Sequence, residues 1–415
     1  MPMLEVFKSR KMAALLLLGF SSGLPLYLTS RTLQAWMTVA GVNLSAIGLF
    51  SLVGLPYSLK FLWSPLIDRF SFPFLGRRKG WLLVTQLGLA VAIAAMSLQK
   101  PSEALRLVVI NAIVIAFLSA TQDTTIDAYR ADILDSHELG AGAGVAVLGY
   151  RIALILTGAA ALILADQLSW PIVYLLLATL MLVTLGVSTW APEPVLRHLP
   201  PASLGQAVRL PFIDFFKRLG LSRGIAILAF IVLYRLGDTM IDNMKTSFLL
   251  QTGFSQTDIG VIQGAMGLSA TILGVLCGGL VVSRAGIYRS LWIFGVLQAA
   301  SNFAYLLLAN AGRNYPLMIA AVNIENFCWG LANAALVGFL MSLCDPRFSA
   351  TQYALLSSLL AAGRDVLVAP AGSIAQRTGW PVFFLITVAA AVPGMMLLPV
   401  FAPWSKAAGY TDPTD

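Results

Sequence analysis

The stretch Ser119-Ala-Thr-Gln-Asp-Thr-Thr-Ile-Asp-Ala-Tyr-Arg-Ala-Asp132 closes an apolar run that begins near residue 106. Asp123 and Asp127 are four residues apart, so a helix turns both carboxylates to one side, and Arg130 follows three residues further along that face. A charged side chain that faces lipid at the middle of a membrane costs about 2.5–3.5 kcal/mol. The stretch therefore predicts a membrane-embedded helix whose polar face lines an internal cavity.

The composition of the whole chain agrees with this interpretation. Charged residues make up 11% of the 415 residues and hydrophobic residues 58%, and the mean hydropathy is +0.82. Soluble proteins contain about a quarter charged residues. The sequence therefore predicts an all-α integral membrane protein. Its net charge of +8 comes largely from the connections between apolar runs, which favours membrane orientation over nucleic-acid binding.

Apolar runs of about 20 residues, the length that crosses a bilayer, recur along the chain. They predict twelve spans in two six-helix halves, 1–190 and 223–402, joined by a proline-rich, basic linker at 191–222 and followed by a tail at 403–415. The expected spans are 12–39, 45–67, 80–98, 106–129, 140–165, 171–190, 223–250, 256–282, 289–309, 315–343, 349–375 and 380–402.

The distribution of Lys and Arg predicts the orientation of these spans. Most basic residues outside the spans lie in connections on the side of the N-terminus, whereas the opposite connections hold only Lys100, Arg106, Arg313 and Arg377. Basic loops stay on the cytoplasmic side of a membrane. We therefore expect both termini and the linker to be cytoplasmic.

The two halves also carry a repeated motif. Gly41-Val-Asn-Leu-Ser-Ala-Ile-Gly48 joins spans 1 and 2, and Gly253-Phe-Ser-Gln-Thr-Asp-Ile-Gly260 joins spans 7 and 8. Parallel repeats of this kind place a substrate cavity between the halves, near the bilayer midplane.

A charged connection between spans 2 and 3 resembles the loop signature of the major facilitator superfamily. It consists of Trp63-Ser-Pro-Leu-Ile-Asp-Arg69 followed by Gly76-Arg-Arg-Lys79. A carboxylate there can accept from a helix N-terminus, while the cations meet acidic groups or lipid phosphates. We interpret Asp68, Arg69, Arg77 and Arg78 as a gating loop that holds one access state.

Several further stretches resemble the AmpG family of muropeptide permeases within that superfamily. They include Gly19-Phe-Ser-Ser-Gly-Leu-Pro25, Lys60-Phe-Leu-Trp-Ser-Pro65, Leu148-Gly-Tyr-Arg151 and Ser349-Ala-Thr-Gln352. The resemblance implies proton-driven import of N-acetylglucosaminyl-1,6-anhydro-N-acetylmuramyl peptides across the Gram-negative inner membrane by alternating access. It further implies a role in peptidoglycan recycling and a link to β-lactamase induction. It implies no cofactor beyond the proton gradient, and we expect a monomer.

Charged and polar residues inside the spans are the candidate site. Three carboxylates are candidates for proton coupling: Asp123, Asp238 and Glu325. Candidates for substrate binding are Gln34, Gln122, Asp127, Tyr150, Arg151, Arg235, Asn326, Trp329 and Arg364. The Gly23-Leu-Pro25 sequence predicts a helix break that frees carbonyls.

Structural alternatives stay open for several of these residues. Asp123 is alternatively paired with Arg151, Arg235 with Asp238, and Glu325 with Arg364. Asp127 is a gate or a ligand. Trp329 stacks on a sugar or packs in the core.

Other functions are less consistent with the sequence. Asp123, Asp127 and Asp132 lack the second acidic cluster that a magnesium-dependent prenyltransferase needs, so we expect neither a metal site nor an enzyme. A transporter of another large polar solute, such as an amino sugar or an acyl-coenzyme, remains the alternative, and a receptor that does not transport is a third class.

Overall fold

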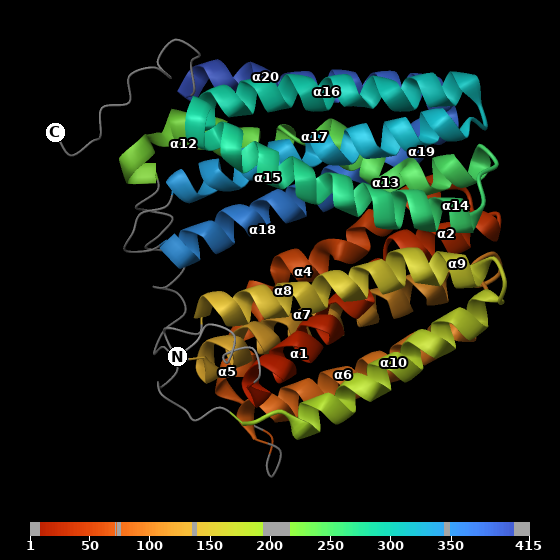
Figure 1. The fold of residues 1–415 in the computed structure, drawn as a ribbon, viewed down its shortest axis with the longest axis vertical. Coiled ribbons are helices and arrows are strands. Elements are labelled where there is room, and N and C mark those ends of the chain that lie inside the picture. Colours follow the sequence, from red (N-terminus) through yellow and green to blue (C-terminus); the bar gives the residue numbers. More distant parts are fainter. Residues whose placement is uncertain are drawn as a thin grey trace. The chain divides into compact units, whose positions relative to one another are not determined.

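The computed structural model describes residues 9–70, 72, 76–134, 139–193, 216–343 and 349–401 (Figure 1). Across these ranges the chain is almost entirely helical, and the only extended pairing is an isolated bridge between Phe72 and Gly76. The predicted all-α fold is confirmed. Most of the predicted linker, 194–215, and the tail at 403–415 lie outside the described residues.

The N-terminal part of the chain forms the first six predicted spans. Its helices are α1 (Arg10–Leu28), α2 (Arg31–Val39), α3 (Leu44–Leu49), η2 (Phe50–Gly54), α4 (Leu55–Leu59), η3 (Lys60–Leu62), α5 (Ser64–Arg69), α6 (Arg77–Ser97), α7 (Leu105–Ile133), α8 (Leu139–Ile155), the π-helix η4 (Leu156–Ala160), α9 (Ala161–Ala165) and α10 (Trp170–Trp190).

The C-terminal part forms the other six. Its helices are α12 (Leu221–Leu233), α13 (Leu236–Gln251), α14 (Gln256–Ile259), the π-helix η5 (Gly260–Met266), α15 (Gly267–Ala285), α16 (Ile287–Ala311), α17 (Tyr315–Ser342), α18 (Ser349–Val368), α19 (Ala371–Thr378) and α20 (Trp380–Phe401).

Nine segments of the described chain are long and apolar enough to cross a membrane. They coincide with nine of the predicted spans, and the remaining three, at 45–67, 315–343 and 349–375, are also helical. The span at 45–67 is divided into short α and 3₁₀ segments, with Pro56 and Pro65 each standing in the first turn of a new helix. Proline lacks an N–H group and so favours such a restart.

The first span does not break where its sequence suggested. The chain stays helical through Pro25 and is interrupted only at Thr29 and Ser30, between α1 and α2. The Pro25 carbonyl is not freed, because it accepts from the Thr29 backbone N–H at 3.2 Å. The matching span of the second half is interrupted at Tyr234 and Arg235, between α12 and α13.

Both copies of the repeated motif have the same local structure, which explains why the sequence is repeated. Gly41 and Gly253 have φ of 77° and 95°, a conformation that glycine adopts without strain and that ends the preceding helix. Asn43 and Ser255 then cap α3 and α14, accepting from the N–H groups of Ala46 at 2.8 Å and Asp258 at 3.0 Å.

The chain packs into two compact units, each of which takes in a short segment from the other half of the sequence. Unit 1 consists of Met1–Val42, Leu52–Ala202 and Ser255–Gly260. Unit 2 consists of Asn43–Ser51, Ser203–Phe254 and Val261–Asp415. The segments Asn43–Ser51 and Ser255–Gly260, which contain α3 and α14, are called the exchanged segments below.

Each exchanged segment is fixed inside its unit by polar contacts. In unit 1, the Thr257 backbone N–H donates to Asp166 Oδ2 at 2.6 Å. In unit 2, the Ser45 hydroxyl donates to Gln376 Oε1 of α19 at 2.7 Å. A Cβ added at Gly372 would overlap the Leu44 carbonyl, so α3 and α19 are in backbone contact.

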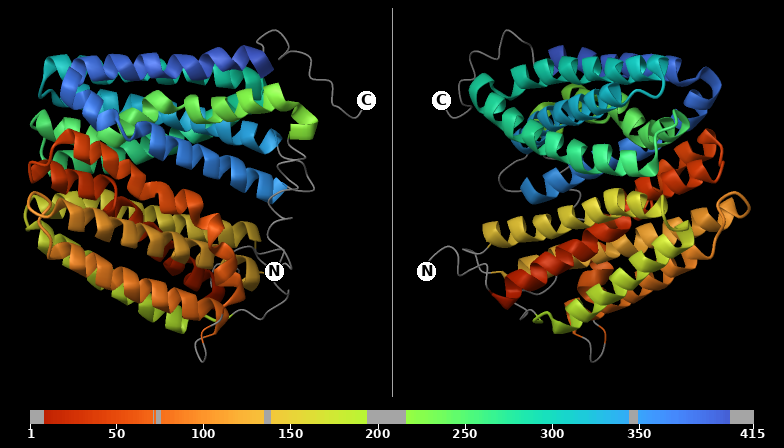
Figure 2. Two further views of the ribbon diagram at one scale, coloured as in Figure 1. Left: turned by 180° about the vertical axis from the view of Figure 1, so that it is seen from behind. Right: turned by 45° about the vertical axis from the view of Figure 1, so that its right-hand side comes forward.

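Within unit 1, α1 and α8 also pack with their backbones in contact, whereas α6 and α10 lie side by side along their length (Figure 2). A Cβ added at Gly149 of α8 would overlap the Leu16 carbonyl, and one added at Gly19 of α1 would overlap the Ala146 carbonyl. Small residues permit this close approach in membrane proteins, where packing replaces the hydrophobic driving force.

We expect Gly149→Ala to lower the free energy of unfolding by about 1–3 kcal/mol, because the new methyl group forces α1 and α8 apart. Thermal unfolding of the purified protein, followed by tryptophan fluorescence, measures the change. Gly186→Ala on α10 is the matched control, since a Cβ there meets nothing within 4 Å. Equal melting temperatures for the two variants would contradict the close packing.

Candidate functional site

Asp123 is the centre of a polar cluster in unit 1. It lies half-buried on α7, where Ser22 of α1 donates a hydrogen bond to its Oδ1 at 2.5 Å. The Tyr57 hydroxyl of α4 is buried and lies close to Asp123, Ser119 and Tyr150. The cluster therefore combines one carboxylate with hydroxyl groups from four helices, a set that can bind sugar hydroxyls and amides.

Asp127, one turn further along α7, is more exposed and is paired with cations. Its carboxylate lies 3.1 Å from Arg130 Nη2 and 3.7 Å from Lys60 Nζ, and 55% of its side chain is exposed. The predicted polar face of Asp123, Asp127 and Arg130 is thus present. Lys60 was not among the predicted site residues, although a lysine inside the predicted span 45–67 was a visible signal.

Gln122 and Gln34 are buried inside unit 1. Gln122 donates to the Ser21 hydroxyl at 3.1 Å, and Gln86 of α6 donates to the same oxygen at 3.0 Å. Ser21 in turn lies 3.0 Å from Thr184 of α10, so this buried network joins α1, α6, α7 and α10. The Gln122 amide therefore holds helices together in this structure.

Arg151 and Asp123 do not form the pair that the sequence left open. Arg151 is exposed on α8 beside the exposed side chains of Leu148 and Ile152, and no ion pair joins it to Asp123 among the described residues. Asp123 instead accepts a hydrogen bond from Ser22 of α1, a helix that contacts both α7 and α8.

Arg235 is the buried cation at the start of α13 in unit 2. Its guanidinium lies 4.4 Å from the centre of the Trp329 ring, and Nη1 donates to Asn333 Oδ1 at 3.2 Å. Both partners are neutral, so the positive charge is held by an aromatic face and an amide. One face of Trp329 is therefore occupied by Arg235.

Asp238 follows Arg235 in the first turn of α13 and is 3% exposed. The alternative that it pairs with Arg235 is wrong, because no cation lies within 4 Å of it among the described side chains. Gln298 and Asn302 of α16 lie beside it instead. The Arg235 guanidinium therefore points toward α17, whereas the Asp238 carboxylate points toward α16.

Glu325 is held by a lysine. Lys245 Nζ of α13 lies 3.3 Å from Glu325 Oε2 and 2.8 Å from Asp242 Oδ1, and the Lys245 and Glu325 side chains are each 1% exposed. Asn326 donates to the same Glu325 oxygen at 3.0 Å. Because Lys245 lies well inside an apolar run, its position in the sequence already indicated that it pairs with an acid.

The alternative that Glu325 pairs with Arg364 is therefore wrong. Arg364 is exposed on α18 and pairs with its neighbour Asp365, with 2.8 Å between Nε and Oδ1. Glu325 of α17 points toward α13. Because α13 carries Lys245, Glu325 has a cationic partner without α18.

Of the predicted gating loop, the structure describes the Arg78 side chain. Arg78 Nε donates to Asp132 Oδ2 at 2.7 Å, and the Arg78 side chain is 8% exposed, so the start of α6 is joined to the end of α7. The side chains of Asp68, Arg69 and Arg77 lie outside the described residues.

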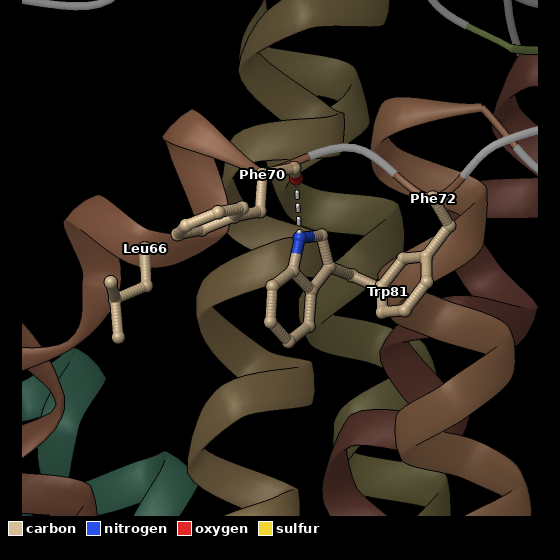
Figure 3. A pocket seen from close by; sticks show the side chains of 4 residues that line it. All are labelled: Leu66, Phe70, Phe72 and Trp81. Atoms are coloured by element: carbon tan, nitrogen blue, oxygen red, sulfur yellow. Dashed lines mark hydrogen bonds between the residues drawn. The ribbon is translucent and has the colours of Figure 1, made fainter.

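An open apolar hollow of about 340 Å³ lies between α5 and α6 (Figure 3). Leu66, Phe70, Phe72 and Trp81 line it, and the Trp81 indole N–H donates to the Phe70 carbonyl at 2.9 Å. The hydrogen bond joins Phe70, which follows α5, to Trp81 of α6.

Comparisons with known proteins agree with the fold. The model of the Major Facilitator Superfamily matches residues 12–366. The chain is 49% identical over 397 residues to the anhydromuropeptide permease of Escherichia coli K12, covering 95% of this chain and 80% of the relative.

Solved structures show the same fold at low sequence identity. The nucleoside transporter NupG matches with a TM-score of 0.72 at 14% identity, covering 94% of this chain and 99% of that one. A POT family transporter in complex with 5-aminolevulinic acid matches with a TM-score of 0.72 at 13% identity, covering 96% and 97%. With 49% identity across nearly its whole length, the chain belongs to the AmpG family of anhydromuropeptide permeases, within the Major Facilitator Superfamily.

Proposed function

We propose that this protein imports anhydro-muropeptides across the inner membrane of a Gram-negative bacterium, driven by the proton gradient, for peptidoglycan recycling. The observation that carries the proposal is the 49% identity to the E. coli anhydromuropeptide permease over 95% of the chain. The excess of Lys and Arg in the connections on one side supports cytoplasmic termini. Delivery of these muropeptides to the cytosol would link the protein to β-lactamase induction.

Each unit, taken by itself, carries polar groups suited to the chemistry of such a substrate. Arg235 is a buried guanidinium held by neutral partners, so it can form bidentate hydrogen bonds with a lactyl or peptide carboxylate without first losing an ion pair. The cluster of Asp123, Ser22 and Tyr57 offers acceptors and donors for sugar hydroxyls and acetamido groups. We infer that Arg235 recognises a carboxylate of the substrate.

Uptake into proteoliposomes tests the proposal. With a pH gradient of one unit, acid outside, and the membrane potential clamped at zero, one coupled proton gives about tenfold accumulation of labelled anhydro-muropeptide. An uncoupler should abolish the accumulation. Wild-type protein that neither binds nor accumulates this substrate would overturn the proposal.

Competing solutes separate the alternatives in the same assay. Unlabelled amino sugar or acyl-coenzyme that displaces the label at lower concentration than the muropeptide would favour the transporter of another polar solute. Saturable binding without uptake would favour a receptor. We expect the complete disaccharide peptide to be the strongest competitor.

A further inference from the structure

The charged side chains of residues 235–251 and of α17, all in unit 2, do not balance. Arg235 and Lys245 supply two cations, whereas Asp238, Asp242 and Glu325 supply three carboxylates. Four of these five side chains are at most 7% exposed, and Asp242 is 44% exposed. Because an uncompensated charge in a low-dielectric interior costs several kcal/mol, an added proton is most favourable on a carboxyl group that is buried and lacks a cationic partner.

Glu325 and Asp242 are poor places for that proton. Glu325 Oε2 is contacted by the Lys245 ammonium and by the Asn326 amide, and both are donors that stabilise the ionised carboxylate. Asp242 contacts the same ammonium at 2.8 Å and is also partly exposed. Lys245 thus gives both acids a cationic partner.

Asp238 has the opposite surroundings. Within the described residues no cation lies within 4 Å of it, and its Oδ2 is buried without a hydrogen-bond partner. The groups that face it are Arg235 and Tyr234 on its own segment, Glu325 and Cys328 from α17, and Gln298 and Asn302 from α16. α20, which packs against the same helix, carries no charged residue.

The two amides complete a closed polar pocket. Gln298 is 3% exposed and Asn302 fully buried, and both oxygens and both nitrogens of the two side chains lack partners. A Cβ added at Gly237 would overlap the Thr387 carbonyl of α20, so the backbone of α20 closes the pocket on that side. Buried polar groups are normally hydrogen-bonded, so these two amides have donors and acceptors that Asp238 beside them can use.

A carboxyl group between two amides can gain and lose a proton without leaving an unpaired partner. A protonated Asp238 donates its O–H to an amide oxygen, and an ionised Asp238 accepts from an amide N–H. The first turn of α13, where Asp238 lies, favours the ionised form through the helix dipole. Both states are therefore accommodated in the same pocket.

We propose that Asp238, positioned by Gln298 and Asn302, binds the coupling proton, while Lys245 keeps Glu325 ionised as a fixed charge. This rests on the proposed function, since it assigns the proton of that transport reaction to one carboxyl and adds two positioning residues. Glu325 then leaves the set of proton carriers and becomes the counter-ion of Lys245.

Asp238→Asn tests the assignment in proteoliposomes. With a pH gradient of one unit, we expect the accumulation ratio to fall from about tenfold to about one, because the amide carries no exchangeable proton. Counterflow of labelled anhydro-muropeptide at equal pH on both sides should stay within about threefold of wild type, since the amide resembles the protonated carboxyl. Normal accumulation by this variant would overturn the proposal.

The double variant Lys245→Met, Glu325→Gln is the decisive comparison. It removes one positive and one negative charge, so it should retain counterflow and gradient-driven accumulation. If it retains counterflow but loses accumulation, Glu325 carries the proton and the proposal is wrong. Accumulation by wild type that follows a sodium gradient at equal pH would also overturn it, because carboxylate and amide oxygens suit that cation as well.

The role of the amides is tested with one substitution at two places on α16. Asn302→Leu should shift the pH midpoint of gradient-driven uptake by about one unit to higher pH, because the ionised carboxylate loses a donor. Asn310→Leu, at an exposed position, is the matched control and should leave the midpoint unchanged. Equal pH profiles for the two variants would refute the positioning role even if Asp238→Asn proves unstable.

The two proposals fail in different ways. Wild-type protein that neither binds nor accumulates anhydro-muropeptide refutes the proposed function. Wild-type protein that accumulates it with a pH gradient, together with an Asp238→Asn variant that does the same, refutes only this inference.

Discussion

Replacing Lys245 by methionine is expected to lower the free energy of unfolding by about 3–5 kcal/mol, because it leaves the Glu325 carboxylate buried without its cation. Glu325 is 1% exposed, whereas Asp242 is 44% exposed and can be hydrated when Lys245 is removed. Denaturation of the purified protein, followed by tryptophan fluorescence, gives the value.

Two further variants show whether the loss comes from burial. Adding Glu325→Gln to Lys245→Met should recover most of the lost stability, since the unpaired charge is gone. Lys100→Met is the matched control, because Lys100 pairs with Glu103 at 3.1 Å where both side chains are about two-thirds exposed, and it should cost about 0–1 kcal/mol. If Lys100→Met and Lys245→Met lower the free energy of unfolding by similar amounts, burial does not make the Lys245–Glu325 pair more important for stability.

Arg235→Gln is expected to weaken binding of anhydro-muropeptide by about 30-fold or more, the cost of losing a buried charge-assisted contact. The same variant should bind N-acetylglucosamine, which has no carboxylate, as wild type does. Isothermal titration with the two ligands measures both constants. If affinity for the neutral sugar falls by the same factor, Arg235 supports the fold and does not recognise carboxylates.

Two arginine variants control for charge and for position. Arg235→Lys keeps the positive charge but loses the planar guanidinium that lies over Trp329, so it should recover part of the affinity. Arg223→Gln removes an exposed arginine at the start of α12 and should leave both constants unchanged.

Hydropathy was enough to locate the helices, because length and apolarity decide whether a segment crosses a membrane. The same signal could not place the interruptions within spans. Pro25 was the expected break in the first span, yet α1 continues through it to Leu28. The interruptions at Thr29–Ser30 and Tyr234–Arg235 have no proline at the break, and they depend on packing against neighbouring helices.

The candidate site was partly predictable for a similar reason. A charged residue within an apolar run must face the protein interior, so Asp123, Asp238 and Glu325 could be selected from the sequence. Their partners could not, because pairing depends on which helices are adjacent and how each is rotated. Glu325 was assigned to Arg364 as one alternative, but α17 turns it toward Lys245. Asp238 likewise lies beside Gln298 and Asn302 of α16, whose neutral side chains give no charge signal in the sequence.

The exchanged segments set a condition on how the protein matures during synthesis. Residues 255–260 belong to unit 1, so this unit lacks α14, and Asp166 lacks its Thr257 partner, until more than half of the chain has left the ribosome. Residues 43–51 belong to unit 2 and are made long before the rest of that unit exists. Neither half of the sequence can therefore complete its own unit alone. Unit 1 stays in the membrane without α14 until residues 255–260 have been synthesised.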